Sequence, residues 1–201
     1  MIHPRLQALA RRVVEWLVAP LGATRLDPNA LTVAGLAVSF ATAFVIALGW
    51  TVAGGVLVLV AGAFDMLDGA LARVRRAHST FGAFLDSTLD RWAEGLIFTG
   101  LLWHLEGVDH HVEALLAVLT LIGSMLISYA RARAEGLGIA CTVGFFQRPE
   151  RLIVLGIALL GPPWLLTGAL WFLAVVTQLT AIQRIVHVHQ QIEAARSREP
   201  G

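Results

Sequence analysis

Apolar residues fill long stretches of the chain, and short groups of charged residues separate these stretches. A helix that rises 1.5 Å per residue needs about 20 apolar residues to cross a bilayer. The pattern predicts six membrane-spanning helices, at residues 30–50, 52–73, 81–105, 112–132, 152–160 with flanking residues, and 164–186. The predicted fold class is therefore an all-α integral membrane protein. One membrane domain covers residues 1–201, with a six-helix transmembrane bundle at residues 30–187.

The two ends of the chain have a different pattern. In residues 1–22, apolar side chains recur at helical spacing, with arginine and glutamate on the other faces. This predicts an amphipathic helix that lies in the membrane interface before the first span. Residues 190–201 are polar and are expected to form a cytoplasmic tail that frays from about Gln190. His187 and His189 follow the last span and are expected to face water.

Composition and charge placement agree with a membrane protein. Hydrophobic residues make up 57% of the chain, more than in an ordinary soluble domain, and all 15 basic residues are arginine. Nearly all arginines lie at residues 73–76, at 131–151 and near the termini, whereas the connections at 49–55, 104–112 and 161–163 contain none. The positive-inside rule then predicts a multi-pass protein of the cytoplasmic membrane, with both termini and the active site on the cytoplasmic side. No nucleic-acid partner is expected.

Four aspartates lie within or at the cytoplasmic ends of the second and third predicted spans, where an unpaired carboxylate costs several kcal/mol. They are Asp65, Asp68, Asp86 and Asp90. Spacings of three and four residues place each pair on one helix face, so two helices can bring four carboxylates together. A cation would stabilise that cluster, and oxygen ligands favour Mg²⁺, Mn²⁺ or Ca²⁺ over zinc. The alternative is pairing with neighbouring arginines, and Arg91 is expected to be such a structural partner of Asp90.

Eight residues at fixed spacing over 26 positions resemble the complete signature of the CDP-alcohol phosphotransferases. The string is Asp65-x-x-Asp68-Gly69-x-x-Ala72-Arg73 and, after eight residues, Gly82-x-x-x-Asp86-x-x-x-Asp90. Six spans preceded by an interfacial helix are also similar to this family. The resemblance implies transfer of a phosphatidyl-type group from a CDP-linked lipid to an alcohol, with release of CMP.

The resemblance also implies roles for the signature residues. Asp65, Asp68 and Asp86 would bind two divalent ions, Mg²⁺ or Mn²⁺, while Asp90 would complete the metal site and act as general base for the acceptor hydroxyl. The residues expected at the nucleotide are Asp68, Gly69, Ala72, Arg73, Gly82 and Thr32. Thr32 could equally be a first-turn residue after a helix cap. A homodimer embedded in membrane lipids is expected by analogy alone.

Several arginines lie near the predicted cytoplasmic side, and they indicate which chemical group the acceptor carries. They are Arg131, Arg148, Arg151 and Arg184. Guanidinium groups bind phosphate with two parallel hydrogen bonds, which suggests an acceptor that already carries a phosphate, although the positive-inside rule explains the same residues. The surrounding strings resemble the phosphatidylinositol-phosphate and archaetidylinositol-phosphate synthase branch, which implies inositol 1-phosphate held by Arg131, Arg151 and Arg184. Glycerol 3-phosphate is the alternative.

Two other classes of membrane protein also carry carboxylates in the membrane. An intramembrane prenyltransferase also uses aspartates and magnesium but needs a longer chain, and a cation transporter would place its carboxylates near the midplane. A second acidic and histidine-rich group lies between the third and fourth predicted spans, at His104, Glu106, Asp109, His110, His111 and Glu113. It has no fixed metal-ligand spacing, so a solvated interfacial loop is favoured over a metal site.

Overall fold

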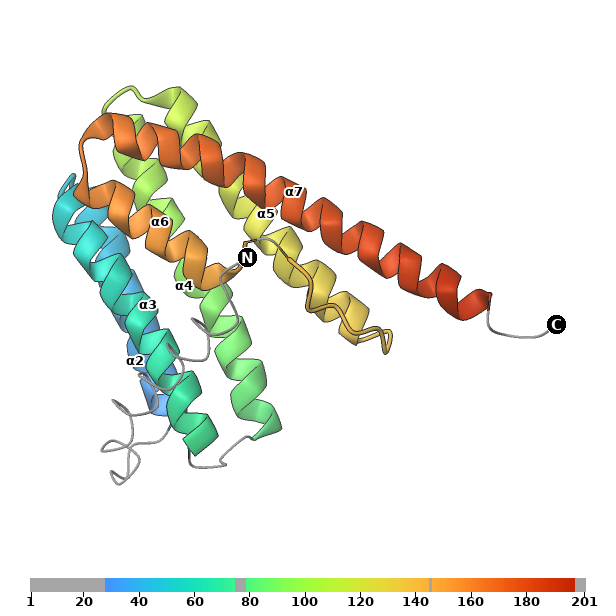
Figure 1. Cartoon of the computed structure of the whole chain (residues 1–201). Helices are drawn as coiled ribbons and strands as arrows, with labels where there is room; N and C mark the ends of the chain where they lie inside the picture. The colour runs from blue at the N-terminus through green and yellow to red at the C-terminus, as the bar shows by residue number, and fades with distance from the viewer. Residues whose placement is uncertain (1–27, 75–78, 145, 198–201) are drawn as a thin grey trace, which may run out of the picture. The chain divides into compact units, whose positions relative to one another are not determined.

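The computed structural model describes residues 28–74, 79–144 and 146–197, with the backbone alone for residue 28 and residues 64–74. These residues form six α-helices and no strand (Figure 1). The helices are α2 (Pro28–Ala47), α3 (Thr51–Val74), α4 (Thr80–Gly107), α5 (His111–Glu135), α6 (Arg148–Leu160) and α7 (Pro163–Arg196). The all-α prediction is confirmed over this part of the chain. The predicted interfacial helix at residues 1–22 lies outside the described residues.

The chain divides into two compact units, Met1–His104 and Leu105–Gly201, and each is described by itself. In the first unit, α2 packs along α3. The turn between them is a Schellman motif, because the N–H of Gly49 bonds to the carbonyl of Ile46 and that of Trp50 to the carbonyl of Val45. Gly49 has φ of 85°, a left-handed conformation that favours glycine. The chain therefore turns back on itself at Gly49.

Two glycines allow helices of the first unit to approach closely. A Cβ at Gly54 of α3 would lie 2.3 Å from Cγ1 of Ile46 on α2. A Cβ at Gly100 of α4 would lie 2.2 Å from the backbone oxygen of Ala43 on α2. Both partner residues are buried, since Ala43 is 8% exposed and Ile46 is fully buried. Small residues thus replace side-chain packing with backbone proximity, as is typical of helix contacts in membranes.

In the second unit, α5 and α7 lie side by side and run in the same direction (Figure 1). Two contacts fix this direction, because Glu113 near the start of α5 accepts a hydrogen bond from Thr167 near the start of α7. Further along both helices, the carbonyl of Ile127 accepts one from Arg184. The short helix α6 precedes α7 by a tight turn and packs on it. The three helices therefore alternate in direction along the chain.

The arginines of the second unit gather at one of its two ends. Arg131 lies in the last turns of α5, Arg148 is the first residue of α6, and Arg184 lies in the C-terminal half of α7. At the opposite end, residues 105–113 and 161–163 contain no arginine. The start of α6 is fixed by a capping box between Gln147 and Glu150.

Among the described residues, three helices are long and apolar enough to cross a membrane. They are Asn29–Ala47, His111–Glu135 and Pro163–Arg196. Large apolar side chains such as Phe40, Phe44 and Ile182 are exposed on these helices, which suits lipid as the surrounding medium. With 13 residues, α6 spans only about 20 Å, less than a hydrocarbon core of about 30 Å. The chain is thus shown to be helical and membrane-like, while six crossings stay a prediction.

The C-terminal end of α7 differs from the expectation. Fraying was expected from about Gln190, but the helix continues to Arg196. Its 34 residues correspond to about 51 Å, well beyond the thickness of a hydrocarbon core. An ion pair between Glu193 and Arg196, at 3.5 Å, supports the last turn. The apolar pattern ends before this segment, yet its residues are good helix formers, so the span and the helix end at different places.

Candidate active site

The first two aspartates lie in the C-terminal part of α3. Asp65 and Asp68 are separated by one helical turn, and the backbone there is helical as predicted. The side chains of these two residues, and of Gly69, Ala72 and Arg73, lie outside what the structure describes. The helical backbone alone places both aspartates on one side of α3.

The second pair, Asp86 and Asp90, lies near the start of α4. Both side chains are partly buried, and one carboxylate oxygen of Asp86 is shielded from solvent. Asp68 precedes the end of α3 at Val74 by six residues, and Asp86 follows the start of α4 at Thr80 by six residues, so each is about 9 Å from its helix end. Asp68 of α3 and Asp86 of α4 therefore lie equally far along their helices from residues 75–79, which join the two helices.

A third carboxylate continues the same face of α4. Glu94 follows Asp90 by four residues, as Asp90 follows Asp86. Only 1% of Glu94 is exposed, the deepest burial of any acidic side chain that the structure describes. Glu94 was not among the predicted site residues, although it lies one further step along the four-residue spacing of Asp86 and Asp90. A buried carboxylate is stable only with polar or cationic neighbours, so α4 carries a polar face well into its span.

The start of α4 explains why the signature has glycine at position 82. The hydroxyl of Ser79 caps the helix by accepting a hydrogen bond from the Gly82 N–H at 2.8 Å. A Cβ at Gly82 would lie 2.8 Å from that hydroxyl and 3.1 Å from Oδ1 of Asn29 on α2. Gly82 therefore lets the first turns of α2 and α4 come together. Thr32, the other nucleotide candidate in this region, is half-buried in the second turn of α2.

Arg91 was expected to be a structural partner of Asp90. Its Nη1 lies 4.0 Å from Oδ2 of Asp90, at the outer limit of an ion pair. The same guanidinium also donates to the carbonyl of Ser87. Arg91 therefore contacts the backbone of α4 more closely than it contacts the carboxylate of Asp90.

Arginines from three helices come together in the second unit. Arg131 of α5 and Arg151 of α6 both lie within electrostatic range of Arg184 of α7. Arg151 and Arg184 are buried, with 2% and 5% of their surface exposed, whereas Arg131 is exposed. Burying positive charges close together is unfavourable without an anion or hydrogen-bond acceptors nearby. Three of the four predicted acceptor-phosphate residues are thus gathered in one place.

The contacts of Arg184 differ from those of a free phosphate ligand. Its Nε donates to the carbonyl of Val143 at 2.9 Å, and its Nη1 donates to the carbonyl of Ile127 at 2.5 Å. Two of its five N–H groups therefore bind the protein backbone. Arg184 joins α7 to both α5 and the segment that follows α5, a structural role that the sequence did not predict.

The other predicted acceptor residues have partners of their own. Nε of Arg131 donates to Oε1 of Glu135 at 2.8 Å, one turn further along α5. Arg151 donates weakly to the carbonyl of Phe146 at 3.5 Å. Arg148 is half-buried at the first position of α6. Glu135 also lies within electrostatic range of Arg184, so one carboxylate partly balances this group of arginines.

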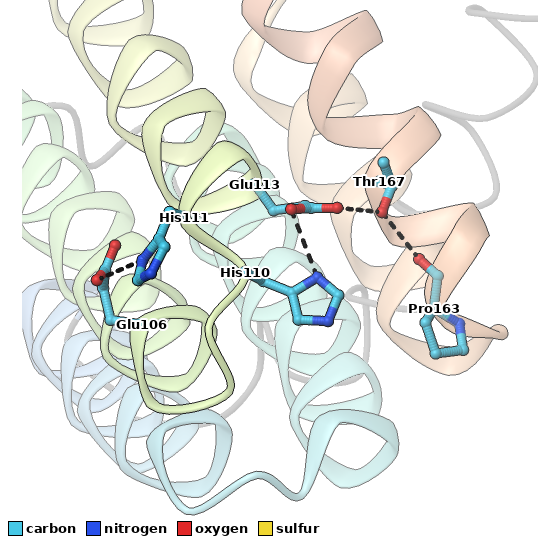
Figure 2. Close-up of polar contacts among 6 residues, drawn as sticks. All are labelled: Glu106, His110, His111, Glu113, Pro163 and Thr167. Carbon is cyan, nitrogen blue, oxygen red and sulfur yellow. Dashed lines mark hydrogen bonds and ion pairs between the residues drawn. The ribbon is translucent and has the colours of Figure 1, made fainter.

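The histidine-rich group at the opposite end of the second unit forms a clasp between helices (Figure 2). The hydroxyl of Thr167 donates to Oε1 of Glu113 at 2.9 Å, and Nδ1 of His110 lies 3.4 Å from the other carboxylate oxygen. His111 contacts Glu106 at 3.1 Å. These side chains satisfy one another in pairs. A search of the described residues finds no three acidic, histidine or cysteine side chains placed to hold a metal, either here or on α4.

Comparisons with known proteins agree with these features. A sequence model described as CDP-alcohol phosphatidyltransferase matches residues 25–182. The chain is 35% identical over 188 residues to the archaetidylinositol phosphate synthase of Methanothermobacter thermautotrophicus, covering 91% of this chain and 94% of that protein. It is 40% identical over 172 residues to the phosphatidylinositol phosphate synthase of Mycobacterium tuberculosis, covering 80% of this chain and 78% of that protein.

The same mycobacterial enzyme is similar in structure. Its crystal structure with bound CDP-DAG matches with a TM-score of 0.79 and 35% identity, over 88% of this chain and 94% of that one. Its complex with manganese and citrate matches with a TM-score of 0.76 and 36% identity, over 87% and 88% of the two chains. The matched region contains the complete eight-residue signature on α3 and α4. The chain therefore belongs to the CDP-alcohol phosphatidyltransferase family.

Proposed function

We propose that this enzyme transfers a phosphatidyl-type group from a CDP-linked lipid, CDP-diacylglycerol or an ether analogue, to a hydroxyl of inositol 1-phosphate. The acceptor hydroxyl would bond to the phosphorus that carries the lipid, and the bond from that phosphorus to CMP would break. The hydroxyl proton would pass to a carboxylate, and the products would be CMP and a lipid that keeps the acceptor's own phosphate.

One observation carries the choice of acceptor: Arg131, Arg151 and Arg184, from three different helices, come together with two of them buried. A phosphate monoester matches guanidinium groups in both charge and hydrogen-bond geometry. Free inositol would leave these positive charges without an anion. Glycerol 3-phosphate carries the same group and is the second candidate. The names of the similar proteins, which are inositol phosphate lipid synthases, favour inositol 1-phosphate.

The aspartates of α3 and α4 suit a divalent metal site. Asp65, Asp68, Asp86 and Asp90 offer only carboxylate oxygens, the donor set that hard cations such as Mg²⁺ and Mn²⁺ prefer. When bound, such ions hold a diphosphate and neutralise the charge that grows on a leaving nucleotide. We infer two ions per site from the resemblance, and the manganese in the similar mycobacterial structure supports a divalent metal.

Asp90 is the proposed general base. It lies one turn further along α4 than Asp86, its side chain is partly exposed, and its contact with Arg91 is long. A carboxylate at the edge of a metal site can accept the proton of an acceptor hydroxyl as the new bond forms. Asp68, Gly69, Ala72, Arg73, Gly82 and Thr32 are the residues proposed to line the nucleotide.

The arrangement of arginines also supports an orientation. All the arginines of the second unit described here lie toward the end that carries the connection from α5 to α6, and the opposite end has none. The positive-inside rule then places the arginine-rich end, and the acceptor site with it, in the cytoplasm. A multi-pass protein of the cytoplasmic membrane, six crossings, cytoplasmic termini and a homodimer complete the proposal.

The experiment is a measurement of CMP release by the purified full-length protein in detergent, with CDP-diacylglycerol and Mg²⁺. Inositol 1-phosphate, glycerol 3-phosphate, free inositol and serine are compared as acceptors. Selective turnover with inositol 1-phosphate is expected. Turnover with glycerol 3-phosphate alone would overturn the acceptor, and equal turnover with free inositol would show that the arginines bind no acceptor phosphate.

A further inference from the structure

The segment that follows α5, residues 136–144, lies against the C-terminal half of α7, and we call it the strap. Two side chains of α7 hold it: Nε of Arg184 donates to the carbonyl of Val143 at 2.9 Å, and Nε2 of His187 lies 3.3 Å from the carbonyl of Ala140. A carbonyl oxygen only accepts, so Nε2 of His187 carries a proton in this contact. His187, which was expected to face water, is half-buried and also contacts the strap through this exposed hydrogen bond.

The two contacts form a matched pair. Arg184 and His187 are three residues apart on one face of α7, and their partners Val143 and Ala140 are three residues apart on the strap. The order is reversed, so the strap runs antiparallel to α7. Between the two anchored residues lies Cys141, whose exposure is 0%, while its neighbours Ala140 and Thr142 are exposed. The strap therefore lies with the side chain of Cys141 buried and the side chains on either side of it exposed.

The strap depends on these contacts because it contains no helix or strand of its own. After the last turn of α5 ends with a bond from the N–H of Ile139 to the carbonyl of Ala134, no backbone ladder continues. Segments held by few hydrogen bonds open locally at a small cost in free energy. Loss of the contact from Arg184 or from His187 should therefore make the strap leave α7 more often.

The strap is linked to the arginines of the acceptor site. Arg184, which holds Val143, also donates to the carbonyl of Ile127, one helical turn before Arg131 on α5. A shift of the strap would change one of the two bonds that fix the guanidinium of Arg184. We propose that His187 is a positioning residue for the acceptor site, which holds the strap on α7 and so keeps Arg184 oriented toward an incoming phosphate. The effect on the acceptor rests on the proposed function, whereas the clamp itself does not.

Cys141 provides a direct test, because it is the single cysteine of the chain and its side chain is buried while the strap lies on α7. The rate of maleimide labelling of the full-length protein measures how often the strap opens. His187→Ala should raise this rate between about two- and tenfold, the range given by one hydrogen bond. His187→Gln keeps an N–H donor and should label as slowly as wild type. The matched control is His189→Ala, which changes an exposed histidine on the same helix.

The outcomes separate the clamp from a general loosening of the helix. Unchanged labelling in His187→Ala would overturn the clamp, as would equal acceleration in His189→Ala. A His187→Gln variant that labels as fast as His187→Ala would show that the hydrogen bond is not responsible. Melting temperatures close to wild type in all three variants should accompany the labelling result.

Kinetics test the link to the acceptor. In His187→Ala, the KM for inositol 1-phosphate should rise several-fold, whereas the KM for CDP-diacylglycerol and the kcat at saturating acceptor should stay near wild type. An unchanged acceptor KM, with faster labelling, would overturn the positioning role and leave the clamp standing. Absence of any turnover of inositol 1-phosphate by the wild-type protein would overturn the proposed acceptor, and with it this role of His187, while the labelling still decides the clamp.

Discussion

Arg184 of α7 donates a hydrogen bond to the carbonyl of Ile127 on α5, two residues separated by 57 positions in the chain. Nε of the same side chain holds Val143, so one guanidinium joins two helices and the strap. Arginines at the ends of membrane spans usually serve orientation, with the charge in water. Here the charge is buried, and Arg184 is one of the residues proposed to bind the acceptor phosphate.

Replacement of Arg184 should therefore affect both stability and acceptor binding. Arg184→Lys keeps the positive charge, but its single ammonium nitrogen cannot take the positions of both Nε and Nη1, which bind two separate carbonyls. Leaving one carbonyl without its donor should lower the free energy of unfolding by about 1–3 kcal/mol. The KM for inositol 1-phosphate should rise more than that for the CDP-linked donor. Thermal unfolding checks the loss of stability, and steady-state kinetics check the two KM values. A wild-type KM for inositol 1-phosphate in Arg184→Lys would contradict the role of the guanidinium in acceptor binding.

Asp86 of α4 should be needed for turnover but not for folding. Asp86→Asn removes a charged ligand but keeps the size of the side chain, so CMP release should fall by at least about 100-fold, the scale of losing one electrostatic contact to a transition state. The variant should elute from size exclusion like wild type. The control is Glu106→Gln, which changes an exposed carboxylate in the histidine-rich clasp of the second unit. CMP release by Asp86→Asn at near wild-type rate would refute the proposed site.

A glycine pair on α4 tests the close approach of helices in the first unit. Gly100→Ala would place a Cβ 2.2 Å from the backbone oxygen of Ala43, so the helices would have to separate. We expect a loss of about 1–3 kcal/mol in the free energy of unfolding. A Cβ at Gly95, on the same helix, would meet no atom within 4 Å, so Gly95→Ala should be at least as stable as wild type. Melting temperatures of the two variants in detergent decide this, and equal values would show that the helices do not touch at Gly100.

The clasp at the far end of the second unit should be structural only. Thr167→Val removes the hydroxyl that donates to Glu113 and should lower the free energy of unfolding by about 0.5–1.5 kcal/mol. Glu113→Gln and the double variant complete a cycle that isolates the contact. Both KM values should stay at wild type, because the clasp lies at the end of the unit away from the arginines. A changed acceptor KM in Thr167→Val would mean that the two ends are coupled.

Much of the fold could be predicted because helices and apolar stretches coincide in this chain. The predicted span at residues 112–132 corresponds to α5, His111–Glu135, and polar residues near its ends mark both limits. The end of α7 was missed because residues after Val186 are polar but still favour a helix. Hydropathy reports the edge of the membrane, which is a different property from the end of a helix.

The aspartates of the first unit and the arginines of the second were predictable to different degrees. The aspartates follow from local spacing, because residues three or four apart share a helix face whatever the rest of the fold does. The contacts of Arg184 join residues 41 and 57 positions apart, so no local pattern contains them. The strap and His187 depend on the same long-range packing. Sequence thus predicted which residues carry charge, and the structure adds which partners hold them.

The most direct test of the proposed reaction is mass spectrometry of the lipid formed by the purified protein from CDP-diacylglycerol and inositol 1-phosphate, quantified against the CMP released. We expect one product, a phosphatidyl group joined to inositol phosphate, in equal amount to CMP, and no product in Asp86→Asn. Release of CMP with phosphatidic acid as the only lipid product would show hydrolysis instead of transfer. That result would contradict the proposed function.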